Sequence, residues 1–491
     1  MADSSTGDLA LSVLRALGIS NVPAPIITDK SITTIVGSQL LVGGDIDVSE
    51  VVITNPSDTP MAISAIPLTS VNGLGAMPIA AGATIRLQGF RSDIFLYSPA
   101  AGKSITTLVS RRSPLFNQYS QRCIAASHRV GTPTQLVSGI KTITSRNVIF
   151  FRPDGDVSDL QFVFQNWYWD NSYNEAVVGN DITVTASIEY PAGVFNRIKF
   201  GGKVSRLMPG GVAITLVSDT LPITGKAGDK AVLWTCQDLP AAGNNFVVSL
   251  IEGSTAFDQN VNSDATDAGG AAGNWNYAYA PIVLGTCAAP NPKSYVIAGD
   301  SISRGQADNV PSATRGAYGW PARAMDNAGQ TYVKLAKSGM GSNTFINGVF
   351  VRDLISKLRF SHILTQIGTN DLQGGGTAQA VINMVGRVAQ VFGSAKPVFA
   401  TFVPRNTSTD GYTTIANQTM TPAKFQQFND LLRSFNVPVL DAADAASSGR
   451  NSGIWRIDQG AMTNDGTHPN SVGAAVIASD TYLQNKLKAI A

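Results

Sequence analysis

Two prolines within three residues, Pro290-Asn291-Pro292, divide this chain into parts with different hydrophobic patterns. Before them, short apolar runs at 51–54, 160–169 and 182–190 are separated by Gly, Pro, Asn and Ser, which is typical of antiparallel β structure. After them, short and nearly continuous apolar runs alternate with segments whose apolar residues recur at helical spacing. Strands that are apolar on both faces and alternate with helices form a parallel sheet covered by helices. The order of the patterns therefore predicts a multidomain protein in which all-β modules precede an α/β domain.

We predict three domains from this division. Residues 1–115 would form a small β-sandwich module with a short amphipathic helix at 8–17, and residues 116–288 a second β-sandwich or jelly-roll domain. Residues 293–491 would form a three-layer α/β/α domain. The runs expected as strands of the first module are 32–36, 51–54, 61–67, 84–87 and 94–97. The runs expected as parallel strands are 295–298, 332–335, 363–367, 398–402 and 437–440. The segments expected as helices of the last domain are 351–358, 380–391, 424–435 and 472–487.

The charge balance argues against some classes of partner. The 491 residues include 36 Lys and Arg against 34 Asp and Glu, a net charge of +2, so no global field favours nucleic acid or anionic lipid. No run of about 18 consecutive apolar residues is present, which argues against membrane insertion. The first basic residue is Arg15, and residues 1–20 lack an uninterrupted apolar core, so this segment does not resemble a secretion signal. We therefore expect a soluble protein with a neutral partner, such as a polysaccharide.

Neither the cysteines nor the acidic turn at 153–159 predicts a metal site. Cys123, Cys236 and Cys287 lie far apart and show no zinc spacing, so we expect small buried thiols rather than a disulfide framework. The segment Pro-Asp-Gly-Asp-Val-Ser-Asp at 153–159 has three carboxylates, but it lacks the spacing of a calcium loop and begins with a turn signature. We therefore predict no bound metal.

Three polar motifs follow elements of the predicted α/β domain. Ser301 comes directly after the run at 295–298, and Asn370 follows the run at 363–367. Asp465 and His468 share a turn before the last helical segment. Reacting groups collect at the carboxyl ends of parallel strands. The Asp465 carboxylate would hold one imidazole nitrogen of His468, and the other nitrogen would take the proton of Ser301, which gives a nucleophile, a base and an orienting acid.

Other titratable residues offer alternatives for these roles. Asp441 follows the run at 437–440 and could be the acid, although Asp465 is preferred because it lies three residues from His468. His128 and His362 have no neighbouring carboxylate in sequence, so we expect both to be structural or surface residues.

Four blocks of sequence resemble the SGNH/GDSL hydrolase family over residues 294–491. They are Gly299-Asp300-Ser301, Ser338-Gly339-Met340-Gly341, Gly368-Thr369-Asn370-Asp371 and Asp465-Gly466-Thr467-His468, in the family's order. The resemblance implies an oxyanion hole made by the backbone N–H of Ser301, the backbone N–H of Gly339 and the side chain of Asn370. Members of the family often have Asn just before the glycine block, where this chain has Lys334-Leu335-Ala336-Lys337, so Gly341 stays an alternative to Gly339.

The resemblance implies a serine ester hydrolase that acts through an acyl-serine and needs no cofactor. The leading substrate class is an O-acetyl ester of a surface polysaccharide, while lipase or thioesterase action stays open. An architecture of β modules followed by an esterase resembles phage tail or virion proteins. The alternative is a structural or receptor-binding virion protein whose hydrolase domain serves only as a scaffold. A homo-oligomer would suit either virion role, although no coiled-coil heptads are present.

Aromatic and amide side chains near the four blocks are candidates for substrate contact. We expect the pocket walls to include Tyr318, Trp320, Gln373 and Trp455. A second aromatic run at 167–173 would either contact sugar rings or pack in the core of the β domain.

Overall fold

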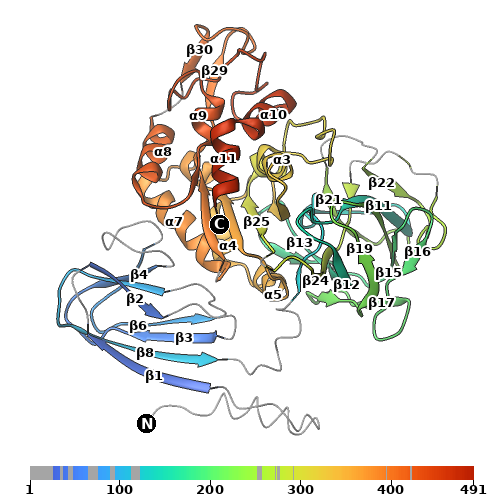
Figure 1. The fold of residues 1–491 in the computed structure, drawn as a ribbon, viewed down its shortest axis with the longest axis horizontal. Coiled ribbons are helices and arrows are strands. Elements are labelled where there is room, and N and C mark those ends of the chain that lie inside the picture. The colour runs from blue at the N-terminus through green and yellow to red at the C-terminus, as the bar shows by residue number, and fades with distance from the viewer. Residues whose placement is uncertain are drawn as a thin grey trace.

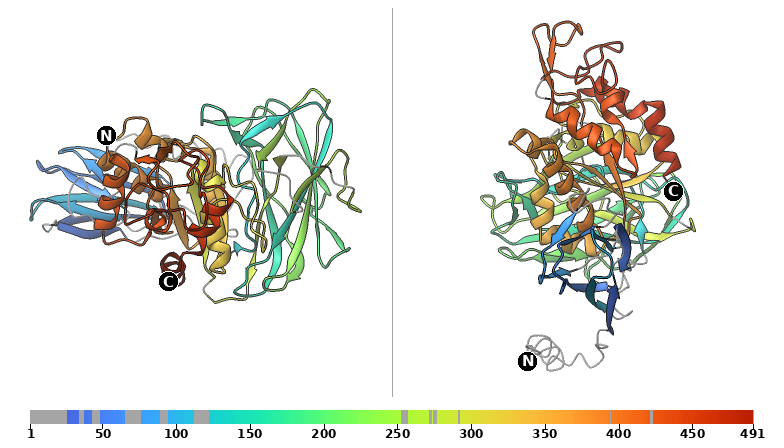
Figure 2. Two further views of the ribbon diagram at one scale, coloured as in Figure 1. Left: turned by 90° about the horizontal axis from the view of Figure 1, so that it is seen from above. Right: turned by 90° about the vertical axis from the view of Figure 1, so that its left-hand side faces the viewer.

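The structure, a computed structural model, describes residues 26–33, 37–42, 48–64, 76–88, 94–111, 122–251, 257–270, 273, 277–290, 292–393, 395–420 and 423–490. The helix predicted at 8–17 lies outside these residues. In Figure 1 and in the left view of Figure 2, the α/β part of the chain lies between an N-terminal β part and a larger β part.

The N-terminal part consists of two antiparallel sheets around one apolar core. Their strand orders are β1-β8-β3-β6 and β2-β7-β4-β5. The strands are β1 (Ile26–Thr33), β2 (Gly37–Val42), β3 (Val48–Thr54), β4 (Met61–Ser64), β5 (Met77–Ile79), β6 (Thr84–Gln88), β7 (Ile94–Ser98) and β8 (Ser104–Arg111). Alternate residues of β3 and β7, such as Val51, Ile53 and Leu96, are fully buried in the shared core. This module is a β-sandwich, in which β3, β4, β6 and β7 coincide with predicted strands.

The larger β part is also built from antiparallel sheets. The strand orders are β16-β15-β20-β11-β22 with β17 on β15, β18-β12-β24-β9 with β19 on β12, β10-β21-β23, and the hairpin β13-β14. The strands are β9 (Cys123–Ile124), β10 (Gln135–Val137), β11 (Thr142–Phe150), β12 (Val157–Gln165), β13 (Trp167–Trp169), β14 (Glu175–Val177), β15 (Ile182–Glu189), β16 (Phe195–Arg197), β17 (Ser205–Met208), β18 (Thr215–Val217), β19 (Leu221–Gly225), β20 (Lys230–Asp238), β21 (Phe246–Leu250), β22 (Asp258–Val261), β23 (Tyr277–Ala278) and β24 (Ile282–Cys287). Phe162 and Phe164 of β12 share one core with Ile182 of β15 and Leu233 of β20, so two of the sheets pack face to face.

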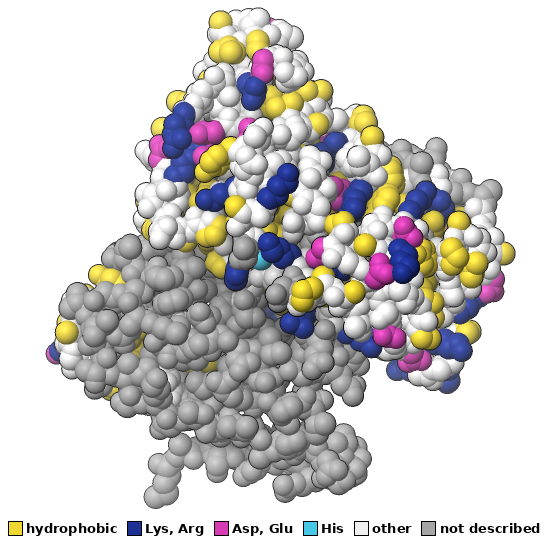
Figure 3. Space-filling model, in the orientation of Figure 1, with side chains coloured by type: hydrophobic (Ala, Val, Ile, Leu, Met, Phe, Trp, Pro, Cys, Tyr) yellow, Lys and Arg dark blue, Asp and Glu magenta, His cyan; other side chains and the backbone are white. Residues whose placement is uncertain are grey.

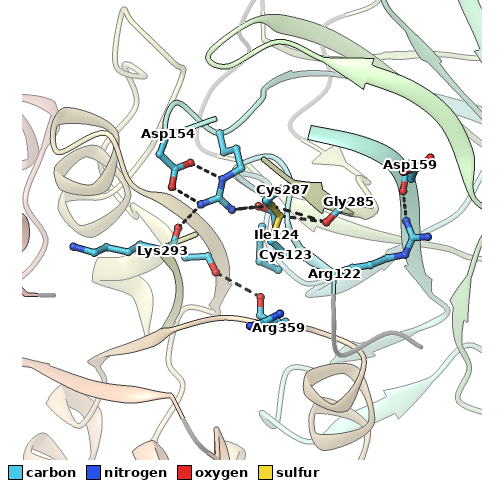
Figure 4. Close-up of a disulfide and its surroundings, with 11 residues drawn as sticks. Arg122, Cys123, Ile124, Asp154, Asp159, Gly285, Cys287, Lys293 and Arg359 are labelled. Atoms are coloured by element: carbon cyan, nitrogen blue, oxygen red, sulfur yellow. Dashed lines mark hydrogen bonds and ion pairs between the residues drawn. A yellow bond between two sulfur atoms is a disulfide. The ribbon is translucent and has the colours of Figure 1, made fainter. Parts of the chain in front are cut away.

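A disulfide joins Cys123 to Cys287, with 6.2 Å between their Cα atoms (Figure 4). The expectation of three buried thiols was therefore wrong for these two, and only Cys236 is a buried free thiol among the described cysteines. The pairing of β9 with β24 brings the two residues together across 164 positions, which sequence spacing alone does not reveal. Beside the disulfide, Arg152 pairs with Asp154 and donates to the carbonyl oxygen of Lys293 at 3.0 Å. These contacts fix the point at which the chain enters the α/β part.

The α/β part is a parallel sheet with strand order β26-β25-β27-β28-β31. The strands are β25 (Ser294–Gly299), β26 (Thr331–Ala336), β27 (His362–Gln366), β28 (Lys396–Ala400) and β31 (Val439–Leu440). The helices are α2 (Ser301–Arg304), α3 (Trp320–Asn327), α4 (Ser342–Asn347), α5 (Phe350–Ser356), α6 (Thr369–Gln373), α7 (Ala378–Val391), α8 (Lys424–Ser434), α9 (Ala442–Ala446), α10 (Ser471–Ser479) and α11 (Thr481–Ala489). A hairpin of β29 (Asn406–Ser408) and β30 (Gln418–Met420) completes the elements.

Helices cover both faces of this sheet. Val296 and Ala298 of β25 point into a core shared with α4, α5, α7 and α8. Tyr295 and Ile297 of the same strand point into a second core shared with α3, α9, α10 and α11. Successive side chains of a strand face opposite ways, so a run that is apolar at every position requires a layer on each face. The parallel sheet expected from the sequence is therefore present, with helices on both sides.

The last helical segment, predicted as one helix at 472–487, is two helices, α10 and α11. Asp480 lies between them, and its carboxylate accepts a hydrogen bond from the backbone N–H of Leu483 at 2.9 Å. An Asp in this position starts a new helix because it satisfies a backbone N–H that has no partner within the helix.

The larger β part continues the parallel sheet beyond its edge strand β26. The backbone N–H of His128 donates to the carbonyl oxygen of Tyr332 at 2.8 Å, and His128 forms a parallel bridge with Val333. The buried ammonium of Lys337 donates to the carbonyl oxygens of Thr134 and Trp169 at 2.7 and 3.0 Å. The edge of the sheet next to the glycine block is therefore covered by the β part.

On the one face that Figure 3 shows, acidic and basic side chains of the described residues are interspersed. Within the part of the chain that the structure describes, no helix is long and apolar enough to cross a membrane.

Candidate active site

Ser301 is the first residue of α2 and follows the carboxyl end of β25. The Asp300 side chain caps this helix, because its Oδ1 accepts a hydrogen bond from the backbone N–H of Ile302 at 3.0 Å. β25 pairs with β26 on one side and β27 on the other, so the segments that follow all three strands meet at one edge. The fold therefore places Ser301 between the glycine block after β26 and the asparagine block after β27.

Ser301, His468 and Asp465 form a continuous chain of hydrogen bonds. The Oγ of Ser301 lies 2.8 Å from Nε2 of His468. The Nδ1 of His468 lies 2.6 Å from Oδ2 of Asp465. Both imidazole nitrogens are therefore engaged, one by the hydroxyl group and the other by the carboxylate. A carboxylate that holds Nδ1–H leaves Nε2 free to accept the serine proton.

The loop that carries His468 is held by its own hydrogen bonds. The Oδ1 of Asp465 accepts from the backbone N–H groups of Thr467 and His468 at 2.9 and 2.8 Å. Partial burial raises the pKa of Asp465, but the hydrogen bonds from His468 and Thr467 outweigh it and hold the pKa well below its usual range. Thr463 Oγ1 donates to the carbonyl oxygen of His468 at 2.8 Å. Asp465 is therefore an ionised acceptor near neutral pH.

The glycine and asparagine blocks are linked to each other. The side-chain amide of Asn370 donates to the carbonyl oxygen of Met340 at 2.9 Å. Asp371 Oδ2 accepts from the backbone N–H and from the hydroxyl group of Ser342, both at 2.8 Å. An amide NH₂ group has two N–H donors, so Asn370 keeps one for a ligand. Gly339, in a left-handed conformation with φ of +83°, and Gly341, which precedes α4, both belong to this linked segment.

A residue that the sequence did not single out ties the nucleophile helix to the glycine block. Arg304, the last residue of α2, donates from Nη1 to the hydroxyl group of Ser338 at 2.6 Å. The backbone oxygen of the same arginine accepts from Lys334 at 3.2 Å. No local motif marks Arg304 for this role, because its partners lie some thirty positions away.

Three of the four expected pocket walls are buried instead. Trp320 and Trp455 have no exposed surface, and Tyr318 is 4% exposed, so the prediction that they contact substrate was wrong. The reason is that a large aromatic side chain in an α/β fold fills the space between sheet and helices. Trp455 nevertheless supports the loop that carries His468, since its indole N–H donates to the carbonyl oxygen of Gly466 at 3.1 Å. Gln373 is exposed at the end of α6.

The remaining histidines have structural partners. His128 Nε2 lies 2.9 Å from the carbonyl oxygen of Ala280, and His362 Nδ1 lies 2.7 Å from the hydroxyl group of Ser361. Burial lowers the pKa of each imidazole to about 4. Both are therefore neutral residues of the interior.

Asp441, the alternative acid, and two carboxylates of the acidic turn at 153–159 form ion pairs with basic side chains. Asp441 pairs with Arg433, whose Nη2 lies 2.6 Å from its Oδ1. Asp154 pairs with Arg152, and Asp156 with Lys226. Among the described residues, no group of three or more His, Cys, Asp and Glu side chains is arranged to hold a metal ion.

The aromatic run at 167–173 packs mainly against the α/β part. Trp167 and Trp169 have no exposed surface. Their rings lie 5.9 Å from Phe350 and 5.6 Å from Phe345, respectively. Of the two predicted alternatives, contact with sugar rings and packing in a core, the second therefore applies to these two tryptophans. Tyr173 differs, because 39% of it is exposed.

Residues 297–476 match the model of the GDSL-like Lipase/Acylhydrolase family. No curated protein matches the chain. Among solved structures, a GDSL-like lipase from Bacteroides thetaiotaomicron is 18% identical over 40% of this chain and 89% of its own, with a TM-score of 0.29. A family two carbohydrate esterase from Clostridium thermocellum, in complex with cellohexaose, is 12% identical over 73% of this chain and 94% of its own, with a TM-score of 0.31. A salicylyl-acyltransferase from a tetracycline biosynthetic pathway is 16% identical over 71% of this chain and 83% of its own, with a TM-score of 0.29.

Proposed function

The C-terminal part of the chain carries a GDSL-like acylhydrolase domain, and we propose that this domain is a serine esterase with Ser301, His468 and Asp465 as its catalytic residues. The observation that carries the proposal is the chain of hydrogen bonds of 2.8 and 2.6 Å that runs from Ser301 through His468 to Asp465. Nucleophile, base and orienting acid in this relation are what acyl transfer through a serine requires.

The proposed reaction has two stages. The Oγ of Ser301 attacks the ester carbonyl carbon while Nε2 of His468 takes the hydroxyl proton. The C–O bond then breaks, His468 returns the proton to the departing alcohol, and the acyl group stays on Ser301. A water molecule, deprotonated by His468, hydrolyses the acyl-serine and restores the hydroxyl group. Asp465 holds the imidazole in one orientation and stabilises its protonated form throughout.

The negative oxygen formed at each stage needs hydrogen-bond donors aimed at it beforehand. We assign this role to the backbone N–H of Ser301, to the side-chain amide of Asn370, and to the backbone N–H of Gly339, with Gly341 as the alternative. The adjacency of β26, β25 and β27 supports the assignment, because it brings the segments that carry these donors to one edge.

For the natural substrate we propose an O-acetyl ester of a surface polysaccharide, delivered to the site by the β parts, of which the larger would be a jelly-roll accessory domain. We further propose that the protein acts in a phage tail or virion. The family resemblance and the order of β modules before the esterase domain support this choice.

Ester hydrolysis by the wild-type protein and by Ser301→Ala tests the proposal. We expect p-nitrophenyl acetate to be cleaved faster than the butyrate and octanoate esters, and the variant to be inactive. A fluorophosphonate probe should label Ser301 in the wild type only. If neither hydrolysis nor labelling occurs, the esterase proposal fails, and a binding protein with a scaffold-only hydrolase domain becomes the better description.

A further inference from the structure

We propose that Tyr173, a residue of the larger β part, forms one wall of the substrate site and contacts the sugar ring that carries the ester. This inference rests on the esterase function proposed above and adds a specificity-determining residue from outside the GDSL-like domain.

The turn that carries Tyr173 is built to hold it in place. This turn connects β13 to β14, and Asp170 closes it by accepting from the backbone N–H groups of Ser172 and Asn174 at 2.8 and 2.9 Å. Tyr173 itself has a φ of +64°, in the left-handed region that non-glycine residues rarely adopt. A conformation of this kind persists only where the surroundings enforce it, and such residues concentrate at functional sites.

The hairpin is anchored on the α/β part at both of its ends. At one end, Trp169 packs edge-to-face on Phe345 of α4. At the other end, the Glu175 carboxylate accepts from the first backbone N–H groups of α5, with distances of 2.7 Å to Phe350 N and 2.6 Å to Val351 N. Tyr173 lies between these anchors, so its position relative to the α/β part is defined.

Tyr173 lies directly against the glycine block. A Cβ atom built on Gly339 would collide with the hydroxyl oxygen and the ring edge of Tyr173. Gly339 follows β26, whose last residue, Ala336, pairs with Gly299 two positions before Ser301. Arg304 joins the two segments from the side of the nucleophile helix. The phenol of Tyr173 is therefore beside the segment that we assign to the oxyanion hole.

The exposure of Tyr173 separates it from its aromatic neighbours. Trp167 and Trp169 are fully buried and account for the packing of the hairpin, whereas 39% of Tyr173 is exposed. A tyrosine ring offers an apolar face and a hydroxyl group that donates and accepts hydrogen bonds. The C–H face and the hydroxyl groups of a pyranose match these two features, so a sugar ester is the ligand class that fits this wall.

The test compares an ester with a sugar ring and an ester without one. Glucose pentaacetate is the sugar probe, since it presents an acetyl group at every position, and ethyl acetate is the control substrate. The variants are Tyr173→Asn, which removes the ring but suits a left-handed backbone, and Tyr173→Phe, which removes only the hydroxyl group. Tyr482→Asn, at a 61% exposed tyrosine of α11, is the matched control.

We expect Tyr173→Asn to raise KM for glucose pentaacetate by about tenfold, the scale of one lost aromatic contact, and to raise KM for ethyl acetate by a clearly smaller factor. Tyr173→Phe should keep most of the affinity for glucose pentaacetate, and Tyr482→Asn should change KM for neither substrate. An equal effect of Tyr173→Asn on both esters, or no effect on either, would overturn the proposal.

Binding tests the contact separately from catalysis. In the Ser301→Ala background, calorimetry should show weaker binding of glucose pentaacetate when Tyr173→Asn is added. Equal binding by the two proteins would reject the sugar contact even if the enzyme proves to be an esterase. Weaker binding combined with an inactive wild type would reject the esterase function and leave the sugar contact in place.

Discussion

Two carboxyl groups of the proposed site have pKa values that are shifted in opposite directions. Hydrogen bonds from the catalytic loop outweigh partial burial and lower the pKa of Asp465, which keeps it a charged partner for His468. Burial raises the pKa of Asp300, next to the nucleophile, to about 6. Asp300 Oδ1 caps α2, and the carboxyl group also interacts with the side chain of Thr369. The carboxyl group that orients the base is thus kept charged, and the one that caps the nucleophile helix is kept protonated under mildly acidic conditions.

The raised pKa of Asp300 predicts a pH-dependent stability. Between its ordinary pKa of 3.8 and about 6, the unfolded carboxyl group has lost its proton while the folded one retains it. Folding therefore takes up a proton in this range, and the free energy of unfolding falls as the pH rises through it. Two pKa units correspond to about 3 kcal/mol. Asp300→Asn retains a side-chain oxygen for the cap but cannot titrate.

Urea unfolding of both proteins from about pH 4 to about pH 7 checks this prediction. The stability of Asp300→Asn relative to the wild type should increase across the range and level off above about pH 6. A difference that is constant with pH would show that Asp300 does not titrate in this range.

Asn370 should contribute to kcat through its second N–H group. Removal of one oxyanion-hole donor costs about 3–4 kcal/mol of transition-state stabilisation, so Asn370→Ala should lower kcat roughly a hundredfold or more. Ester kinetics measure the effect, and Asn370→Asp is the matched variant, with the same shape but no N–H donor. Near-wild-type turnover in both variants would remove Asn370 from the proposed role.

At the scale of secondary-structure elements, the β13–β14 hairpin and helix α5 act as one unit. α5 begins where the Glu175 side chain, from another part of the chain, accepts its first backbone N–H groups. Helix starts are normally satisfied by a residue directly before the helix, and Val349 has no side chain suited to this. The stability of α5 therefore depends on the β part, more than 170 positions away.

Substitution of Glu175 tests this dependence. Glu175→Ala leaves N–H groups of α5 without their acceptor and should lower the free energy of unfolding by about 2 kcal/mol, the upper range of a lost helix cap. Glu175→Gln keeps an acceptor oxygen but has no charge. Its free energy of unfolding should therefore lie between those of Glu175→Ala and the wild type. Urea unfolding measures both, and an alanine variant as stable as the wild type would contradict the capping role.

At the scale of the whole molecule, one apolar cluster spans the boundary between the larger β part and the α/β part, in addition to the separate core of the larger β part. Val163, Trp167 and Leu284 of the β part belong to the same apolar cluster as Val333 and Phe345 of the α/β part. The N-terminal module has its own core. Since a unit that folds alone must bury its own apolar surface, we expect the α/β part to need the larger β part for its stability and not to need the N-terminal module.

Truncated proteins test whether the α/β part depends on the larger β part and whether it depends on the N-terminal module. A protein that begins at residue 122 should retain kcat/KM for p-nitrophenyl acetate within about twofold, because the site and its shared core are intact. A protein that begins at residue 293 exposes the covered edge of β26 and the aromatic side chains beneath the hairpin, so it should aggregate or lose activity. Full activity of the shorter protein would show that the shared core is dispensable.

Features that depend on neighbouring residues could be predicted from the sequence. The parallel sheet was predictable because each strand is a local apolar run, and the site was predictable because Ser301, Asn370 and the Asp465–His468 pair each lie in a short motif at a strand end or in a turn. Motifs at the ends of parallel strands converge whatever the details of packing, which is why three distant segments could be combined.

Features that depend on contacts between distant segments could not be predicted from the sequence. The burial of Trp320 and Trp455, the disulfide between Cys123 and Cys287, and the position of Tyr173 beside Gly339 all arise where separate elements meet. Whether an aromatic side chain faces a substrate or a core depends on which element covers it. Local periodicity contains no information on that covering element, because it records only the preference of one segment.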